Sequence, residues 1–188
     1  MVTPFGVTPR WLEAYLNALA EGCEDADARI AADDLNGVKG KEFARCRIKT
    51  AGNVKTGDEI LCLTVPVEGG SSVLKRRGVD PRLSDHGKWR REHLGALNAA
   101  YGSTPYFEHL MPEIEKVYAD SQGISLEEFN SRMLGVILGW IDRSVLISDD
   151  ATLREAGKEV RKHIDADLSA LDMLFRLGKT ASLGLIAG

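Results

Sequence analysis

The most regular alternation of apolar and polar positions lies in residues 86–107. On a helical wheel of about 100° per residue, Trp89, His93, Leu97 and Tyr101 fall within one arc, and charged side chains occupy the opposite side. This pattern predicts an amphipathic helix that ends at Gly102 and packs its apolar face on a core. Because His93 lies within the apolar arc, we expect its imidazole to be buried.

Five further helices are predicted from helical spacing, capping residues and proline positions. Thr8 and Pro9 are typical of a helix start, and Ser125 and Ser169 precede apolar runs as predicted N-caps. The predicted helices are residues 9–19, 105–118, 125–141, 152–164 and 168–177.

Four short strands are predicted from alternation and from apolar runs. In residues 44–49 small or apolar side chains alternate with Arg45, Arg47 and Lys49, which predicts a strand with one face in water. Residues 59–67 are apolar on both faces and predict a buried strand that ends near Pro66. The other two strands are predicted around Ile30 and at residues 144–148.

The length and composition fit one domain over residues 1–188, of which 44% are hydrophobic. We expect a mixed α/β, helix-rich fold with a small sheet of about four short strands surrounded by about six helices. No apolar run reaches the roughly 20 residues that cross a bilayer, and the first residues do not resemble a signal peptide. The expectation is therefore a cytoplasmic protein without membrane insertion.

The charge distribution limits the partners. A formal net charge of -4 argues against general nucleic-acid binding, which usually needs a positive excess. Locally, Lys75, Arg76 and Arg77 begin a basic stretch, preceded by Gly69 and Gly70 in a loop that matches no known phosphate-binding motif. This stretch is either a binding site for a phosphate-bearing ligand or a solvated surface, and the sequence leaves both open.

Three polar side chains occupy positions where the pattern predicts burial, namely His93, Asn130 and Asp172. An unpaired buried polar group costs about 1 to 3 kcal/mol, so each should have a hydrogen-bond partner. In one shared pocket they could act as a proton acceptor, an amide that binds a carbonyl and a carboxylate that orients the imidazole. Alternatively they are satisfied core residues, with Asp172 capping its helix.

The cysteines and histidines suggest no metal site. Cys23, Cys46 and Cys62 are odd in number and widely spaced, which argues against a disulfide framework and a zinc site. Cys46 alternates away from the neighbouring arginines, so packing explains it better than nucleophilic chemistry. The sequence identifies no cofactor.

Three aromatic residues, Tyr101, Tyr106 and Phe107, flank the end of the central helix. They form either a wall for a sugar or base, or an anchor between two helices.

The segments taken together resemble the WbqC-like protein family over the whole chain. The matching segments are FGVTPRWLEAYLNAL, ARCRIK with LTVPVEGG, WRREHLGALNAAYGSTPYFEHL, LEEFN and DLSALDMLF. The chain departs from the family at its N-terminus, which lacks the His-Gln-Pro and Pro-Trp motifs of many members, and at Cys46, where many relatives have asparagine.

The resemblance implies a role in bacterial surface-polysaccharide biosynthesis of the O-antigen type, which is a contextual argument. From it we expect acyl or aminoacyl transfer from an activated acyl donor to an amino sugar nucleotide. In this hypothesis His93 deprotonates the sugar amine, Asp172 orients the imidazole and Asn130 binds a carbonyl. The nucleotide phosphates would meet Arg45, Arg47, Lys75, Arg76 or Arg77.

The alternative is a non-catalytic binding or assembly protein that recognises a glycan intermediate or a polysaccharide enzyme. The sequence does not determine the acyl donor, the substrate or the oligomeric state.

Overall fold

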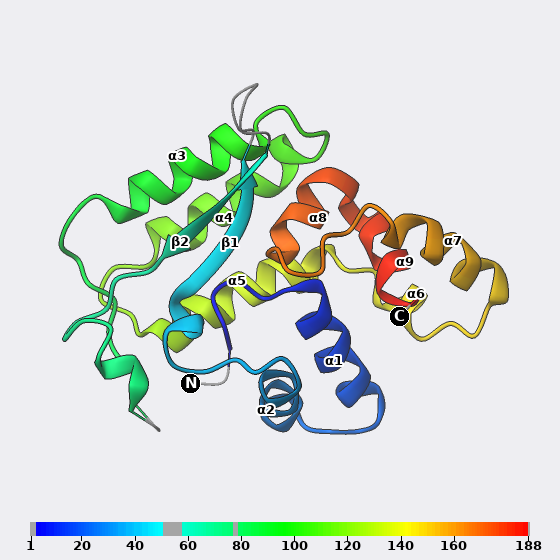
Figure 1. Cartoon of the computed structure of the whole chain (residues 1–188), viewed down its shortest axis with the longest axis horizontal. Helices are drawn as coiled ribbons and strands as arrows, with labels where there is room; N and C mark the ends of the chain where they lie inside the picture. Colours follow the sequence, from blue (N-terminus) through cyan, green and yellow to red (C-terminus); the bar gives the residue numbers. More distant parts are fainter. Residues whose placement is uncertain (1–2, 51–57, 77–78, 188) are drawn as a thin grey trace.

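The structure is a computed structural model that describes residues 3–50, 58–76 and 79–187. Helices surround a two-stranded antiparallel sheet, with α3 and α4 on one side of it and α6, α7 and α9 grouped at the C-terminal end (Figure 1). The helices are α1 Pro9–Ala20, α2 Asp25–Leu35, α3 Trp89–Tyr101, α4 Phe107–Ala119, α5 Leu126–Trp140, α6 Arg143–Leu146, α7 Ala151–Arg161, α8 Ala170–Leu177 and α9 Ala181–Leu185. The strands are β1 Arg45–Thr50 and β2 Glu59–Thr64, and short 3-10 helices lie at Gly40–Ala44, Val73–Lys75 and Gly178–Thr180.

The helix-rich α/β class is confirmed, but the prediction of about four strands is wrong for the part of the chain that the structure describes. Ile30 lies in α2, where Ala28 and Ala32 are fully buried four residues apart and Ile30 is 44% exposed. The weak alternation around Ile30 therefore reflects one helical face, because residues four apart on a helix point the same way.

Residues 144–148 also form no strand. The Asp142 side chain accepts a hydrogen bond from the Ser144 backbone N–H at 3.1 Å and caps the one-turn helix α6. A local cap thus outweighs the strand propensity of the short apolar run.

Strand β1 confirms the predicted alternation. Cys46 and Ile48 are buried, whereas Arg45, Arg47 and Lys49 lie on the opposite face. The strand pairs with β2 in a register that places Cys46 opposite Leu63 and Ile48 opposite Leu61.

The prediction that residues 59–67 form a strand buried on both faces is wrong for most of β2. Ile60 is 65% exposed and Leu61 is 41% exposed, whereas Leu63, Val65 and Val67 are buried. An apolar run shows a preference for burial, but it does not show whether another element covers the strand.

Segments far apart in the sequence hold β1 in place. The Ser169 N–H donates to the Arg47 carbonyl at 2.8 Å, on the edge of β1 that faces away from β2. The next residue, Ala170, donates to the Val7 carbonyl at 2.7 Å. The start of α8 therefore joins the N-terminal segment to β1.

Helices α1 and α2 are joined by a buried carboxylate. The Trp11 indole N–H donates to Asp33 at 2.8 Å, and both side chains are buried. Burial raises the pKa of Asp33 from its ordinary value of 3.8 to about 7, although the hydrogen bond from Trp11 opposes the shift.

We expect Asp33→Asn to stabilise the protein in a pH-dependent way, because the amide oxygen keeps a partner for Trp11 without the buried charge. The folded chain holds the Asp33 proton that the unfolded chain releases between pH 3.8 and about 7, so the contribution of Asp33 to the free energy of unfolding falls as pH rises through this range. The gain should therefore approach, at most, about 4 kcal/mol at about pH 8 and be smaller at about pH 5.

Urea denaturation at both pH values measures this difference. Asp34→Asn, at the exposed neighbouring position, is the matched control and should change little. An equal increase in the free energy of unfolding for Asp33→Asn at both pH values would contradict the raised pKa of Asp33.

Candidate functional site

His93 is buried in an aromatic cluster, as its position in the apolar arc predicts. Its Nδ1 lies 3.0 Å from the Tyr118 hydroxyl, its ring stacks on Phe5 at a centroid distance of 5.9 Å, and Trp89 packs edge-on at 5.2 Å. Burial lowers the pKa of His93 from 6.5 to about 4, and a backbone hydrogen bond with Thr64 opposes the shift. The imidazole is therefore neutral near pH 7 and shielded from solvent.

Asn130 is fully buried on α5 and connects three segments. Its Nδ2 donates to the backbone carbonyls of Thr3 and Phe43, each at 2.8 Å. Its Oδ1 is buried and has no hydrogen-bond partner among the described residues. The amide thus fixes the N-terminal segment and the 3-10 helix before β1 to α5.

Asp172 lies in the first turn of α8, where Ser169 acts as the predicted N-cap by accepting from the Leu171 N–H at 3.3 Å. The Asp172 carboxylate instead accepts from Arg176 Nε at 3.1 Å, one helical turn later. Its side chain is 7% exposed, and that of Arg176 is 42% exposed.

The burial predicted for all three polar residues is confirmed, but each has its own partners. In the described parts of the chain, no hydrogen bond, ion pair or ring contact joins any two of His93, Asn130 and Asp172. Of these three described residues, Asp172 lines the surface hollow described next, which does not include the buried His93 and Asn130.

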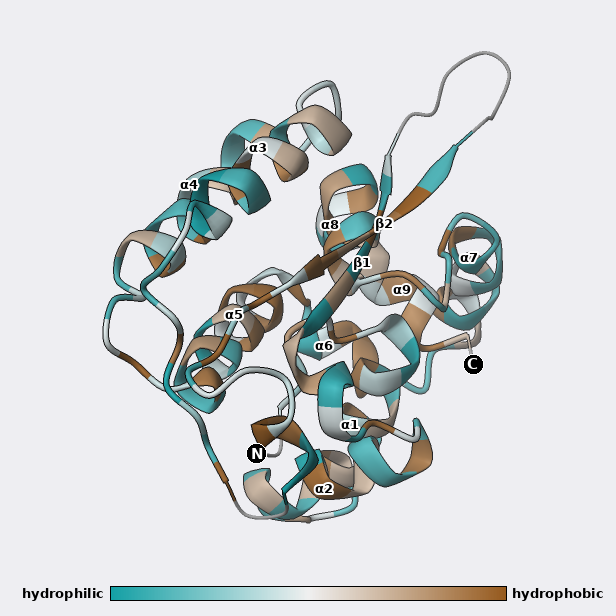
Figure 2. Ribbon diagram, turned by 60° about the vertical axis from the view of Figure 1, so that its left-hand side comes forward, coloured by the Kyte–Doolittle hydropathy of each residue, from teal (hydrophilic) through white to brown (hydrophobic). Residues whose placement is uncertain are grey.

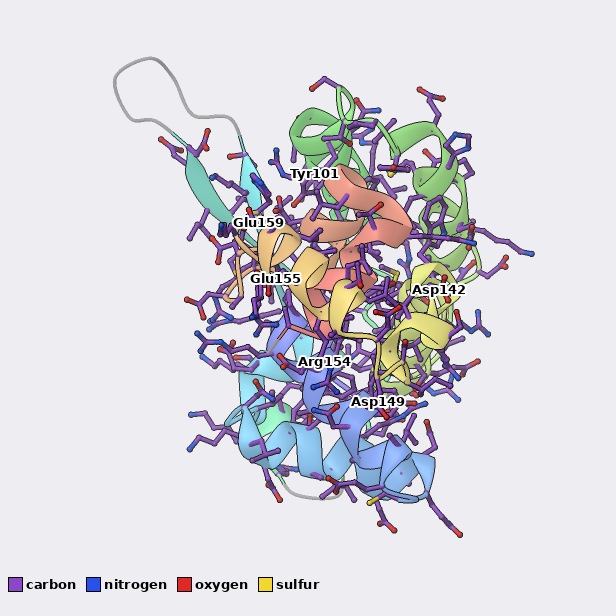
Figure 3. All side chains as sticks on the ribbon, turned by 90° about the vertical axis from the view of Figure 1, so that its right-hand side faces the viewer. Tyr101, Asp142, Asp149, Arg154, Glu155 and Glu159 are labelled. Carbon is purple, nitrogen blue, oxygen red and sulfur yellow. The ribbon has the colours of Figure 1, made fainter. Side chains whose placement is uncertain are left out.

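The Asp172 hollow has a volume of about 530 Å³ and carries both charge signs. It is lined by Lys49, Ser103, Thr104, Pro105, His163, Asp165, Asp172, Arg176 and Leu177. Beneath it the Tyr101 hydroxyl is fully buried without a well-formed hydrogen bond to the described residues. Burial raises the pKa of Tyr101, and the nearby negative charge of Asp172 adds to the shift. Tyr101, the last residue of α3, stacks on Phe175 of α8 and is labelled beside that helix in Figure 3.

A second hollow, the arginine hollow, has a volume of about 460 Å³ and includes Arg10, Arg45 and Arg47 in its lining. Arg45 and Arg47 both bind the Glu42 carboxylate, at 3.0 and 2.8 Å. Burial would raise the pKa of Glu42, but the hydrogen bonds from Arg47 and Arg45 lower it below its usual value. One carboxylate is thus shared between two guanidinium groups.

The two hollows adjoin along the outward face of β1. Arg45 and Arg47 line the arginine hollow, and Lys49, two residues further on the same face, lines the Asp172 hollow. Asp165 belongs to the Asp172 hollow, whereas Ala166 and Asp167 belong to the arginine hollow. Three basic side chains on one face of β1 therefore line two neighbouring polar cavities.

The other predicted binding residues lie elsewhere. Lys75 and Arg76 are exposed and line neither of the two hollows, and Arg77 lies outside the described residues.

The aromatic residues do not form an open wall. Tyr101 and Phe107 are buried and stack on Phe175 at centroid distances of 4.5 and 5.9 Å. Half-buried Tyr106 packs against Gly178, where an added Cβ would lie 2.5 Å from the ring. Of the two alternatives, the anchor between helices is therefore the better description, and it includes α8 as well as α3 and α4.

Cys46 is fully buried, and burial raises its pKa to about 12, which agrees with a packing role. Among the described residues, no group of three or more histidines, cysteines and carboxylates could hold a metal ion. None of the described helices is long and apolar enough to cross a membrane.

Four lining residues are not predicted from the sequence pattern, namely Arg10, Lys49, His163 and Arg176. For Lys49 a signal was present, because it continues the alternation of Arg45 and Arg47. Arg176 lies four residues after Asp172, the spacing of a helical ion pair. Arg10 and His163 join these hollows only through the tertiary fold.

The fold and the hollows define a helix-rich α/β domain with mixed-charge cavities beside a two-stranded sheet. The model of the WbqC-like protein family matches residues 18–170, so the chain belongs to this family. Neither a curated protein nor a solved structure gives a significant match.

The buried imidazole should make the protein sensitive to acid. Because the folded-state pKa of His93, about 4, lies below the ordinary 6.5, the unfolded chain binds a proton that the folded chain excludes, and the contribution of His93 to the free energy of unfolding falls as pH falls through this interval. We expect His93→Gln to be less stable than wild type near neutral pH, since it loses the ring contacts, but to lose less stability between about pH 6.5 and pH 4.

Urea unfolding across this pH range measures the slope. His109→Gln, at an exposed position on α4, is the control and should keep the wild-type slope. A wild-type slope in His93→Gln would show that another group causes the acid sensitivity.

Proposed function

We propose that this WbqC-like protein recognises a sugar nucleotide or a closely related anionic sugar derivative across the two adjoining hollows. The observation that carries the proposal is the placement of Arg45, Arg47 and Lys49 on one face of β1, between the arginine hollow and the Asp172 hollow.

The arginine hollow suits a diphosphate. Guanidinium groups bind phosphate oxygens in a bidentate manner, and two of them here share a single carboxylate, Glu42. Arg10 adds a third guanidinium, whose ion pair with Asp167 is long at 3.9 Å and exposed. A phosphate group can therefore replace weak, solvated pairs rather than a buried one.

The Asp172 hollow suits the sugar part of such a ligand. Asp165 and Asp172 offer acceptors for hydroxyl or ammonium groups, as does the Thr104 oxygen, whose hydrogen is donated to the Tyr101 carbonyl at 2.6 Å, and Lys49 offers a donor. Mixed acceptors and donors at one cavity are what an amino sugar with neighbouring hydroxyl groups requires.

Family membership supports the context of this proposal. The resemblance to the WbqC-like family implies surface-polysaccharide biosynthesis, in which sugar nucleotides are substrates. We place the protein in the cytoplasm on the same argument. In this proposal His93 and Asn130 have structural roles, and Asp172 binds the ligand instead of orienting the His93 imidazole.

A second candidate function is acyl or aminoacyl transfer to a sugar amine. The observation in its favour is that His163, Asp165 and Asp172 line the same hollow. In this version the amine nitrogen attacks the carbonyl of an activated acyl donor, the amine proton passes to His163, and the donor's leaving group departs. His163 replaces His93 as the proton acceptor, because the latter is buried and has a pKa of about 4.

Calorimetric titration with UDP-N-acetylglucosamine tests the binding proposal. Arg47→Ala and Arg45→Ala should each weaken binding by about tenfold or more, because a charge-assisted hydrogen bond contributes about 1.5 to 3 kcal/mol. Added salt should weaken wild-type binding, since the contacts are between exposed charges.

The matched controls are Arg132→Ala, which removes an exposed arginine paired with Glu128, and Lys75→Ala, which removes a cation outside both hollows. Both should bind as wild type does. Equal losses in all four variants would reject the arginine hollow as the site.

Incubation with UDP-glucosamine and acetyl-coenzyme A, followed by mass spectrometry, tests the catalytic version. We expect an amide product whose rate of formation falls by about 100-fold in His163→Ala, the usual scale for loss of a general base. His93→Gln should retain activity in proportion to its folded fraction. Nucleotide binding without any product would leave recognition standing and reject acyl transfer.

A further inference from the structure

The outer edge of β2 carries backbone groups that have no backbone partner among the described residues. The Val65 N–H donates to the Ala44 carbonyl, so this is a hydrogen-bonded pair of the antiparallel ladder. Hydrogen-bonded and non-hydrogen-bonded pairs alternate along such a ladder, so Glu59, Leu61 and Leu63 direct their backbone groups toward β1. The backbone groups of Ile60 and Cys62 therefore point to the opposite edge. The same alternation is seen on β1, where Arg47, which lies opposite Cys62, directs its carbonyl away from β2 and accepts a hydrogen bond from the Ser169 N–H.

This edge is uncovered over a short, defined length. In the ranges that the structure describes, no backbone hydrogen bond reaches Ile60 or Cys62 from the side away from β1. At Thr64 the edge is closed, because the His93 imidazole on α3 lies beside the Thr64 backbone. Figure 2 shows the β1–β2 ribbon extending beyond the helices, with apolar positions on β2.

The exposed side chains agree with an unpartnered edge. Ile60 and Leu61 are the large hydrophobic residues left exposed in the sheet, at 65% and 41%. They lie on opposite faces of β2, since neighbouring strand residues alternate. A partner that packed on one face of β2 would cover Ile60 or Leu61 but not both. A strand added at the edge of β2 carries side chains on both faces, so it contacts both residues.

We propose that two copies of this chain pair through β2, antiparallel, about a two-fold axis at Leu61. Ile60 of each copy then forms a hydrogen-bonded pair with Cys62 of the other, and these are the two residues whose outward backbone groups have no backbone partner in the described parts of the chain. The two ribbons become one four-stranded sheet.

The side chains fit this register. Leu61 faces Leu61 of the second copy in a non-hydrogen-bonded pair, where the Cα atoms approach to about 4.5 Å and the side chains are closest. Glu59 faces Leu63, and Asp58 faces Thr64, so no two like charges are opposite each other. The closed position at Thr64 lies outside the central pairs.

When two copies pair, the outward backbone groups of both β2 strands form hydrogen bonds in the same register. A peptide of unrelated sequence does not ensure this match. The interface is small, so the dimer should be weak and depend on concentration.

Sedimentation equilibrium over about 10 to 500 μM protein measures the association. The average mass of the wild type should rise from monomer toward dimer across this range, and Leu61→Lys should weaken association by about tenfold or more. Leu35→Lys is the matched control, because Leu35 is 77% exposed on α2 and lies away from the edge. Circular dichroism confirms that each variant is folded.

A cysteine cross-link tests the register directly. In a Cys23→Ser, Cys62→Ser background, Leu61→Cys should form a disulfide-linked dimer when diamide is added as oxidant, because non-hydrogen-bonded pairs bring Cα atoms within disulfide range. Leu35→Cys in the same background should cross-link far more slowly. Buried Cys46 is common to both variants.

A monomeric wild type at all concentrations, or equal cross-linking of the two cysteine variants, would overturn self-pairing. A monomer that binds an extended segment of another protein through Ile60 would overturn it as well. Nucleotide binding by the arginine hollow should be unchanged in Leu61→Lys, so this proposal fails or stands separately from the proposed function.

Discussion

The structure depends on a strand that is buried on one face and held at both edges. Strand β1 pairs with β2 on one side and receives the Ser169 N–H on the other. The N-terminal segment lies so close to its inner face that a Cβ at Gly6 would be 2.5 Å from the Cys46 Cα. Because a strand alternates its side chains, fixing Cys46 and Ile48 inward also fixes the basic residues outward, beside both polar hollows.

The buried polar residues are part of this framework. Asn130 joins the N-terminal segment to the residues before β1, His93 pairs with Tyr118, and Asp33 holds the Trp11 indole. In a poorly solvated interior each group favours its neutral or hydrogen-bonded form, which explains why the pKa of His93 is lowered and that of Asp33 is raised. Their burial therefore reflects packing constraints more than reactivity.

The chemistry that a ligand can reach lies at the surface. Arg45 and Arg47 share Glu42, and Asp172 pairs with half-exposed Arg176 at the edge of a cavity. These contacts are partly solvated, so an anionic sugar derivative can compete for them at modest cost. The proposed recognition of a charged glycan precursor therefore depends on these two adjoining hollows and not on His93.

Several features can be predicted from the amino-acid sequence alone: the family, most helices, the alternation of β1 and the burial of His93, Asn130 and Asp172. These features follow from local periodicity and capping, as at Thr8 and Ser125, whose side chains do cap α1 and α5. The sequence did not determine that Ile30 lies on a helix, that β2 is exposed, or that the three buried polar residues stay apart. Those outcomes depend on which distant segments meet, and His163 reaches the Asp172 hollow only because the residues between α7 and α8 pass beside β1. Periodicity shows which face of an element is apolar, but only the tertiary structure decides what covers it.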